Sequence, residues 1–147
     1  MKFIVCQPNE TSDAIRKICI TGHMDDFDKF RMIMDDILNC RACNIYVSME
    51  ERCEETKEER CAILGEMDLV ICLVTRKFLS EPDCLGRKDM DCAMENKIPI
   101  LPILITPGLE NPFNHICGDI HLLDRSSTGY VDTLRERINE ISCDANA

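Results

Sequence analysis

Several acidic side chains could carry chemistry, and their spacing limits what that chemistry can be. Asp25 and Asp26 follow an apolar run and form a carboxylate pair of the kind that holds a metal ion or accepts a phosphoryl group. A phosphoacceptor domain also needs an aspartate after its middle strand, but the corresponding run here ends in Val74 and Thr75. We therefore favour a role for the pair in capping a helix N-terminus and complementing its dipole.

The cysteine and histidine residues form no metal-binding pattern. Cys40 and Cys43 have the spacing of half a zinc site, but no second pair lies at a suitable distance along the chain. The histidines, His23, His115 and His121, are too dispersed to suggest a catalytic triad. A glycine-rich phosphate loop is also absent from the sequence. We expect no bound metal and no permanently bound cofactor.

Net charge restricts the class of partner. The 147 residues carry a net charge of −10, and the basic residues are scattered among acidic ones. Because such a chain repels phosphate backbones and anionic lipids, we expect neither nucleic acid nor membrane binding. Residues 1–5 are too short for a signal peptide, and no apolar stretch reaches the length of a membrane span. We therefore expect a cytoplasmic protein.

The 11 cysteines indicate thiols rather than a disulfide framework. Their number is odd, and several lie inside apolar runs: Cys6, Cys19, Cys72 and Cys92. Buried cysteines behave as small hydrophobic residues, and disulfides are uncommon in reducing compartments. We expect buried thiols at these positions.

Short apolar runs that alternate with helical patterns predict an α/β fold. The runs at 67–75 and 97–105 are apolar without alternation, which is typical of strands covered on both faces. We expect a flavodoxin-like, doubly wound and mainly parallel sheet of five to six strands with helices on both faces. The other expected strands lie at residues 3–6, 18–21, 44–48 and 119–123. A single domain would span 1–147, with its core at 17–142 and an extra strand and loop at 1–16.

Helical periodicity fills the intervals between these runs. A first helix ends near Cys40, and a mostly polar helix lies within 49–66. A further helix is expected over 83–96, whereas 78–82 and 107–114 have the composition of loops. The apolar face of the first helix comprises Phe27, Phe30, Met34 and Ile37. That of the helix at 83–96 comprises Met90, Ala93 and Met94, and that of the closing helix comprises Val131, Leu134, Ile138 and Ile141. Ligands of such sheets bind beyond the carboxyl ends of the strands. The loops to consider are therefore 21–26, 48–56, 75–84 and 105–115.

The centre of the sequence resembles a TIR (Toll/interleukin-1 receptor) domain. A buried strand after Asp68, the sequence Phe78-Leu79-Ser80, a helix, and the proline-isoleucine run at 98–103 follow one another as they do in that family. The resemblance covers residues 17–142 and is closest to bacterial TIR-like sequences, which the stretch 113–119 also resembles. It implies the same doubly wound fold.

The resemblance also implies a substrate. Many TIR domains cleave the nicotinamide–ribose bond of NAD, which passes through an oxocarbenium-like transition state. A carboxylate near the ribose offsets the developing positive charge. The position of the family's glutamate, counted back from Pro99, is occupied here by Asp89. The residues that would line the nucleotide pocket are Thr21, Gly22, His23, Ser48, Met49 and Glu50.

The candidate site departs from the family pattern at several positions. Asp89 is one methylene shorter than glutamate, and a displacement of about 1 Å can reduce a rate on the order of 100-fold. Gly22 replaces an aromatic residue, and Ser48 replaces an aspartate. Asp89 lies on the shoulder of its helix's apolar stripe, so it faces either a cleft or solvent. Glu95 is an alternative carboxylate, but it lies toward the wrong end of the sheet, and His23 either touches a ligand or is a solvated loop residue.

Three functions are compatible with the sequence. The first is a TIR-like NAD glycohydrolase or cyclase, which would act in bacterial antiphage defence. The second is a catalytically degenerate TIR-like module that senses a nucleotide, or that binds other TIR-like domains through the acidic segment 49–60. Charge reversal at Glu54, Glu55, Glu58 and Glu59 in that segment is expected to disrupt such an assembly. The third is a relative of the nucleoside deoxyribosyltransferases, which also place a carboxylate at a ribose.

Overall fold

One six-stranded sheet, in the order β1-β3-β2-β4-β5-β6, organises the protein. The computed structural model describes residues 2–6, 16–41, 43–49, 56–118 and 120–140. The strands are β1 (Lys2–Cys6), β2 (Arg16–Thr21), β3 (Cys43–Met49), β4 (Leu69–Val74), β5 (Ile100–Leu104) and β6 (Leu123–Asp124). Strands β2 to β6 run parallel to one another, and β1 pairs with β3 in the antiparallel direction. The mainly parallel α/β fold is thus confirmed.

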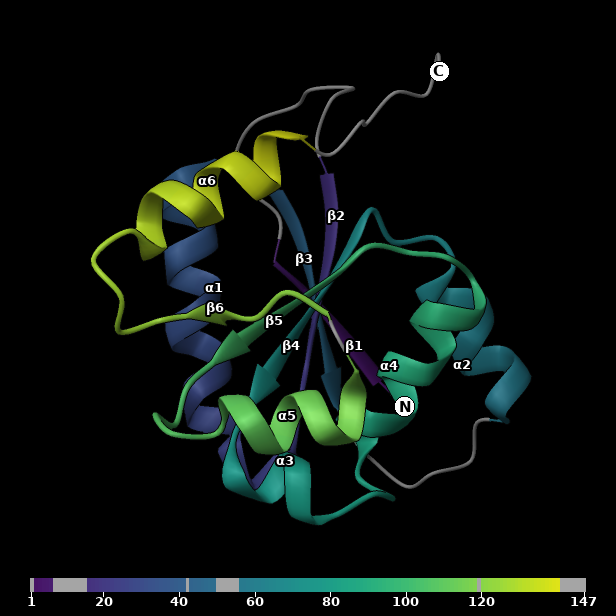
Figure 1. Ribbon diagram of the computed structural model, residues 1–147. Coiled ribbons are helices and arrows are strands. Elements are labelled where there is room, and N and C mark those ends of the chain that lie inside the picture. The colour runs from purple at the N-terminus through teal and green to yellow at the C-terminus, as the bar shows by residue number, and fades with distance from the viewer. Residues whose placement is uncertain (1, 7–15, 42, 50–55, 119, 141–147) are drawn as a thin grey trace.

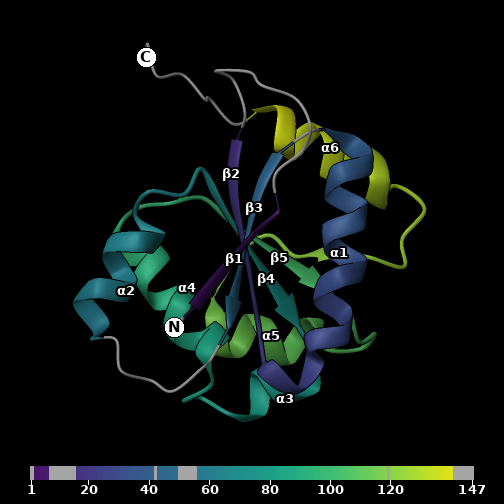
Figure 2. The same ribbon diagram turned by 180° about the vertical axis from the view of Figure 1, so that it is seen from behind.

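Helices cover both faces of this sheet (Figures 1 and 2). They are η1 (Met24–Asp26), α1 (Phe27–Cys40), α2 (Lys57–Leu64), α3 (Arg76–Ser80), α4 (Leu85–Glu95), α5 (Glu110–Cys117) and α6 (Tyr130–Glu140). Helices α1 and α6 pack on one face, and α2 to α5 lie on the other. In the described part of the chain, no helix is long and apolar enough to cross a membrane.

Strand β4 shows why the central run of the sequence lacks alternation. Its odd-numbered side chains, Leu69, Ile71 and Leu73, pack toward α1 and α6. Its even-numbered side chains, Val70, Cys72 and Val74, pack toward the helices of the other face. Successive side chains of a strand point to opposite faces, so a strand covered on both sides has no polar positions.

The assignment of three side chains to buried apolar helix faces is wrong. Phe27, Met94 and Val131 are 43%, 48% and 52% exposed, respectively. In α1 the buried face comprises Phe30, Ile33 and Ile37 instead. Each of the three lies at the margin of its buried stripe, and periodicity alone does not fix where such a stripe ends.

Two segments expected to be loops are helical. Residues 76–80 form α3, which begins where the Thr75 hydroxyl accepts a hydrogen bond from the Phe78 amide. Residues 110–117 form α5, which buries Phe113. The last strand is only Leu123–Asp124, and part of its expected range, Asp119, lies outside the described residues. Helices α3 and α5 are short and depend on packing against the sheet rather than on intrinsic helix propensity.

The expected buried thiols are confirmed at Cys19 and Cys72, where burial raises the pKa of both thiols well above the usual value. The expectation is wrong for Cys92, which forms a disulfide with Cys61. The two residues are 31 positions apart, so only the tertiary packing of α2 on α4 brings them together. The side chain of Cys6 lies outside the described residues.

A polar cluster ties the end of the sheet to α1. Arg125 binds both carboxylate oxygens of Asp36, at 2.9 and 3.3 Å, and the Tyr130 hydroxyl donates to the same carboxylate at 2.8 Å. Asp36 is on α1, whereas Arg125 follows β6 and Tyr130 begins α6. A two-pronged contact of this kind fixes orientation as well as distance.

We predict that Asp36→Asn destabilises the protein by about 1 to 2 kcal/mol, because it removes the charge that both partners bind while the groups are only partly exposed. The measurement is the free energy of unfolding in urea. Asp132→Asn is the matched control, since Asp132 is exposed on α6 and pairs with Arg135 on the same helix. Equal stability of the two variants would contradict a structural role for the cluster.

Candidate functional site

The strand order places a crevice between the loops that follow β2 and β4. From β2 the chain passes to β3 on one side and later returns to β4 on the other. At such a switch point the loops diverge and leave a site beyond the carboxyl ends of the strands. A cavity of about 550 Å³ lies at this place. It is lined by His23, Met24, Asp25, Ser80, Glu81, Pro82, Asp83, Cys84 and Leu85.

His23 forms part of the cavity wall and is held at both ring nitrogens. Its Nδ1 accepts a hydrogen bond from the Asp25 amide at 3.1 Å, and its Nε2 lies 2.9 Å from a Glu81 carboxylate oxygen. Because Nδ1 accepts, the proton of the neutral ring is on Nε2 and is directed at Glu81. The side chain is only 10% exposed, so His23 is not a solvated loop histidine.

The two aspartates after β2 do not cap a helix through their side chains. Asp26 precedes α1 but makes no side-chain cap, and its carboxylate instead accepts a hydrogen bond from the Thr75 hydroxyl at 2.5 Å. Asp25 pairs with Lys77 at 2.8 Å, and this hydrogen bond lowers the pKa of the Asp25 carboxyl. The capping role is therefore wrong. Through Thr75 and Lys77, the two carboxylates connect the loop after β2 to the N-terminal part of α3.

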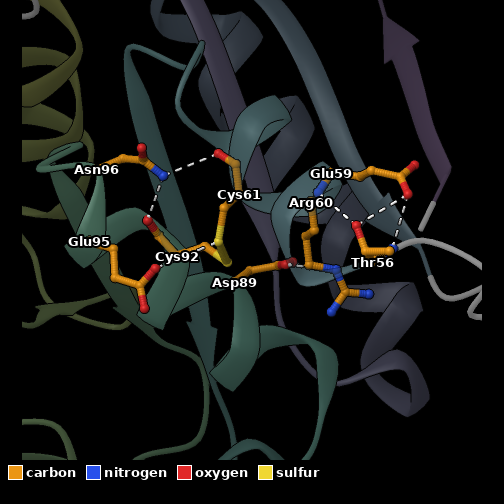
Figure 3. The surroundings of a disulfide bond; sticks show 8 residues. All are labelled: Thr56, Glu59, Arg60, Cys61, Asp89, Cys92, Glu95 and Asn96. Atoms are coloured by element: carbon orange, nitrogen blue, oxygen red, sulfur yellow. Dashed lines mark hydrogen bonds and ion pairs between the residues drawn. A yellow bond between two sulfur atoms is a disulfide. The ribbon is translucent and has the colours of Figure 1, made fainter.

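Asp89 lies at the meeting point of three elements. It belongs to α4, it is fully buried, and its Oδ2 accepts a hydrogen bond from the hydroxyl of Thr21 at 2.6 Å. Its Oδ1 lies 3.7 Å from Nε of Arg60, which extends from α2 (Figure 3). Desolvating a carboxylate is costly unless hydrogen bonds and opposite charge compensate for the lost water. Thr21 and Arg60 provide both kinds of compensation.

Two glycines allow α4 to approach the end of β2. The amide of Gly86 donates to the carbonyl of Gly22 at 3.1 Å, and a Cβ on Gly86 would lie only 2.7 Å from the Cα of Gly22. A Cβ on Gly22 would lie 3.2 Å from atoms of both Leu73 and Phe30. The aromatic residue that the family resemblance implies at position 22 would not fit without repacking.

The structure brings together only part of the predicted site. Thr21 contacts Asp89, Gly22 contacts Gly86 on the same helix, α4, and His23 lines the neighbouring cavity. Asp89 itself is not among the residues that line this cavity, and its side chain is fully shielded from solvent. Ser48 and Met49 end β3, beside β2, but their side chains are outside the described residues, as is all of Glu50.

The alternative carboxylate, Glu95, is exposed at the far end of α4. Sequence reasoning missed Arg60, Glu81 and Cys84. The sequence does carry a signal for Glu81 and Cys84, since they lie in or beside a loop that follows a parallel strand. It carries none for Arg60, because the contact of Arg60 with Asp89 depends on how α2 packs on α4. Burial raises the pKa of the Cys84 thiol, which disfavours the thiolate form that a cysteine nucleophile needs.

Comparison with known proteins gives no assignment. No protein-family model matches the chain, and no curated protein sequence matches it significantly. Among the residues that the structure describes, no group of three or more histidine, cysteine, aspartate or glutamate side chains could hold a metal ion. The function of this protein is therefore inferred from the chemistry of the site.

We predict that Gly86→Ala destabilises the protein by about 1 to 3 kcal/mol, because the new methyl group would press on the backbone of Gly22. In an unobstructed helix the same change would stabilise by up to about 1 kcal/mol, so the sign of the effect is informative. Urea unfolding measures it. Gly129→Ala is the control, since a Cβ at Gly129 would meet nothing within 4 Å. An unchanged stability for Gly86→Ala would disprove the close approach.

Proposed function

We propose that this protein is a TIR-like domain that binds NAD at the carboxyl edge of its sheet and cleaves the nicotinamide–ribose bond. The observation that carries the proposal is the Asp89 carboxylate, held at the end of β2 by the Thr21 hydroxyl at 2.6 Å. This is the edge at which doubly wound sheets bind ligands, and the carboxylate occupies the position that the family resemblance indicates. A cytoplasmic role in antiphage defence belongs to the same proposal.

The chemistry assigned to Asp89 is electrostatic. Breaking the bond between ribose C1′ and the nicotinamide nitrogen leaves the bonding electrons on nicotinamide and positive charge on the ribose. A preorganised carboxylate beside the ribose stabilises that charge as it develops. Water then adds at C1′ and loses a proton, giving ADP-ribose, whereas a cyclase would direct an atom of the same nucleotide to C1′.

The ribose can meet Asp89 only if the carboxylate is uncovered. Asp89 is fully buried and pairs with Arg60, whose side chain is 10% exposed. The proposed reaction therefore includes a displacement of Arg60 when the nucleotide binds. The adjoining cavity, whose wall includes Glu81 and Asp83, offers carboxylates to the cationic nicotinamide ring.

We predict that the purified protein releases nicotinamide from millimolar NAD, and that Asp89→Asn lowers the rate by at least about 100-fold, because it removes the charge that stabilises the ribosyl cation. Chromatographic detection of nicotinamide measures the rate, with and without crowding agents that promote assembly. Asp91→Asn, on the exposed side of the same helix, is the control and should retain the activity.

Absence of nicotinamide under all of these conditions, from a folded protein, would eliminate the enzymatic proposal. The same assay run with 2′-deoxynucleosides distinguishes an NAD-cleaving enzyme from a deoxyribosyltransferase relative. Release of free base from a deoxynucleoside, without cleavage of NAD, would favour the latter.

The complete burial of Asp89 favours a second candidate, a non-enzymatic TIR-like module that self-associates or senses a nucleotide. In this case the contacts of Asp89 with Thr21 and Arg60 are structural, and function lies on the surface. Helix α2 presents acidic side chains there. Glu58 is exposed, whereas Glu59 takes part in the capping box with Thr56 that begins the helix. Glu54 and Glu55 lie outside the described residues.

For this candidate we predict that Glu58→Lys weakens self-association by about 10-fold, because charge reversal opposes complementary electrostatics at an interface. Glu59 is left intact, since its replacement would also remove the cap of α2. Sedimentation velocity over a concentration series measures the association. Glu136→Lys, exposed on α6 at the other face of the sheet, is the control. Equal association of both variants and the wild type would exclude α2 as the interface.

A further inference from the structure

The disulfide between Cys61 and Cys92 joins α2 to α4 directly beside the candidate site (Figure 3). The two Cα atoms are 5.0 Å apart. Cys61 is partly exposed, whereas Cys92 is buried. A small thiol in solution can therefore approach the bond from the side of Cys61.

The same two helices carry the ion pair of the site. Arg60 immediately precedes Cys61 on α2, and Cys92 follows Asp89 by three residues, about one turn, on α4. Residues three apart lie on the same side of a helix. A covalent bond between positions 61 and 92 consequently holds the Arg60 guanidinium at 3.7 Å from the Asp89 carboxylate.

Among the described residues, the apolar contacts of α2 with the core lie toward its C-terminal end. The helix has only eight residues, and isolated helices shorter than about 12 to 15 residues are marginal in water. Leu64 is its buried side chain near the C-terminal end. The Asn96 amide donates to the carbonyls of Cys61 and Cys92, at 3.1 and 2.9 Å. Loss of the covalent bond would leave α2 held mainly by its C-terminal half.

We propose that Cys61 and Cys92 are a redox switch that controls access to Asp89. In the disulfide form, α2 is locked on α4 and Arg60 covers the carboxylate. In the dithiol form, the N-terminal half of α2 separates from α4, and Arg60 moves away from Asp89. The movement follows from the contacts of α2 alone. Its consequence, that the dithiol form is the more active enzyme, rests on the proposed cleavage of NAD.

The switching reaction is thiol–disulfide exchange with a low-molecular-weight thiol of the glutathione class. A thiolate attacks Sγ of Cys61, the bond between the two sulfur atoms breaks, and Cys92 leaves with the electron pair and takes up a proton. A second thiolate attacks the small-molecule sulfur of the mixed disulfide and releases Cys61. In total, two small thiols are oxidised to one disulfide, and the protein disulfide is reduced to two thiols.

The test equilibrates the full chain in oxidised or reduced glutathione and measures three properties of each form. Differential alkylation with mass spectrometry identifies the state of Cys61 and Cys92. Hydrogen exchange follows residues 57–64, with 130–140 on the other face of the sheet as an internal reference. Modification by an arginine-specific dicarbonyl reagent measures the exposure of Arg60.

We predict that reduction accelerates exchange in 57–64 by at least about 10-fold, with no change in 130–140, because local opening of α2 becomes easier. Modification of Arg60 should accelerate in parallel. Cys61→Ser should behave as the reduced form in both buffers, and it avoids a polar substitution at the buried Cys92. Cys40→Ser, on α1 at the opposite face, should respond to glutathione like the wild type.

Equal exchange and equal Arg60 modification in the two forms would overturn the switch, even for a protein that cleaves NAD. Detection of free thiols at both Cys61 and Cys92 in oxidised glutathione would also overturn the switch. If the protein cleaves NAD, the rate should rise by about 10-fold on reduction, since turnover requires the open population. Redox-dependent opening of α2 without any cleavage of NAD would support the structural switch and reject the proposed function.

Discussion

The approach of α4 to the end of β2 is the constraint on which the site depends. Gly86 and Gly22 meet backbone to backbone, with a hydrogen bond of 3.1 Å between them and no room for a Cβ on Gly86. This contact fixes the height of α4 above the sheet, and Asp89, one turn further along, is thereby brought to Thr21. Leu85, which immediately precedes Gly86, lines the adjoining cavity.

The buried carboxylate of Asp89 links the stability of the fold to the proposed site. A carboxylate that has lost its water needs replacement partners, and Thr21 and Arg60 supply them from two different elements. The contacts that permit burial are also those that a substrate ribose would have to replace. An enzyme and a structural module can therefore share this arrangement, and they differ in whether Arg60 leaves the carboxylate. In the proposed redox switch, the disulfide between Cys61 and Cys92 controls whether Arg60 moves away from Asp89.

The loop after β2 is held by polar contacts with Thr75, with α3 and with the segment that follows α3. Asp26 accepts from Thr75, Asp25 pairs with Lys77, and His23 donates toward Glu81. An exposed ion pair such as that of Asp25 and Lys77 contributes little stability by itself, but three polar contacts along one short loop restrict its orientation. The cavity consequently has one wall from the loop after β2 and the other from the segment between α3 and α4.

The sequence alone determined the layered α/β architecture and the edge at which a site would lie. Strands buried on both faces have no polar positions, so the run at 69–74 already implied helices on both sides of a parallel sheet. It also indicated Asp89 and the loop after β2. Tertiary structure decided the remaining features: the burial of Asp89, the role of Arg60 and the disulfide of Cys92. Asp89 and Arg60 are 29 residues apart, and the two cysteines are 31 apart, so their contacts depend on how α2 docks on α4, which local periodicity does not encode.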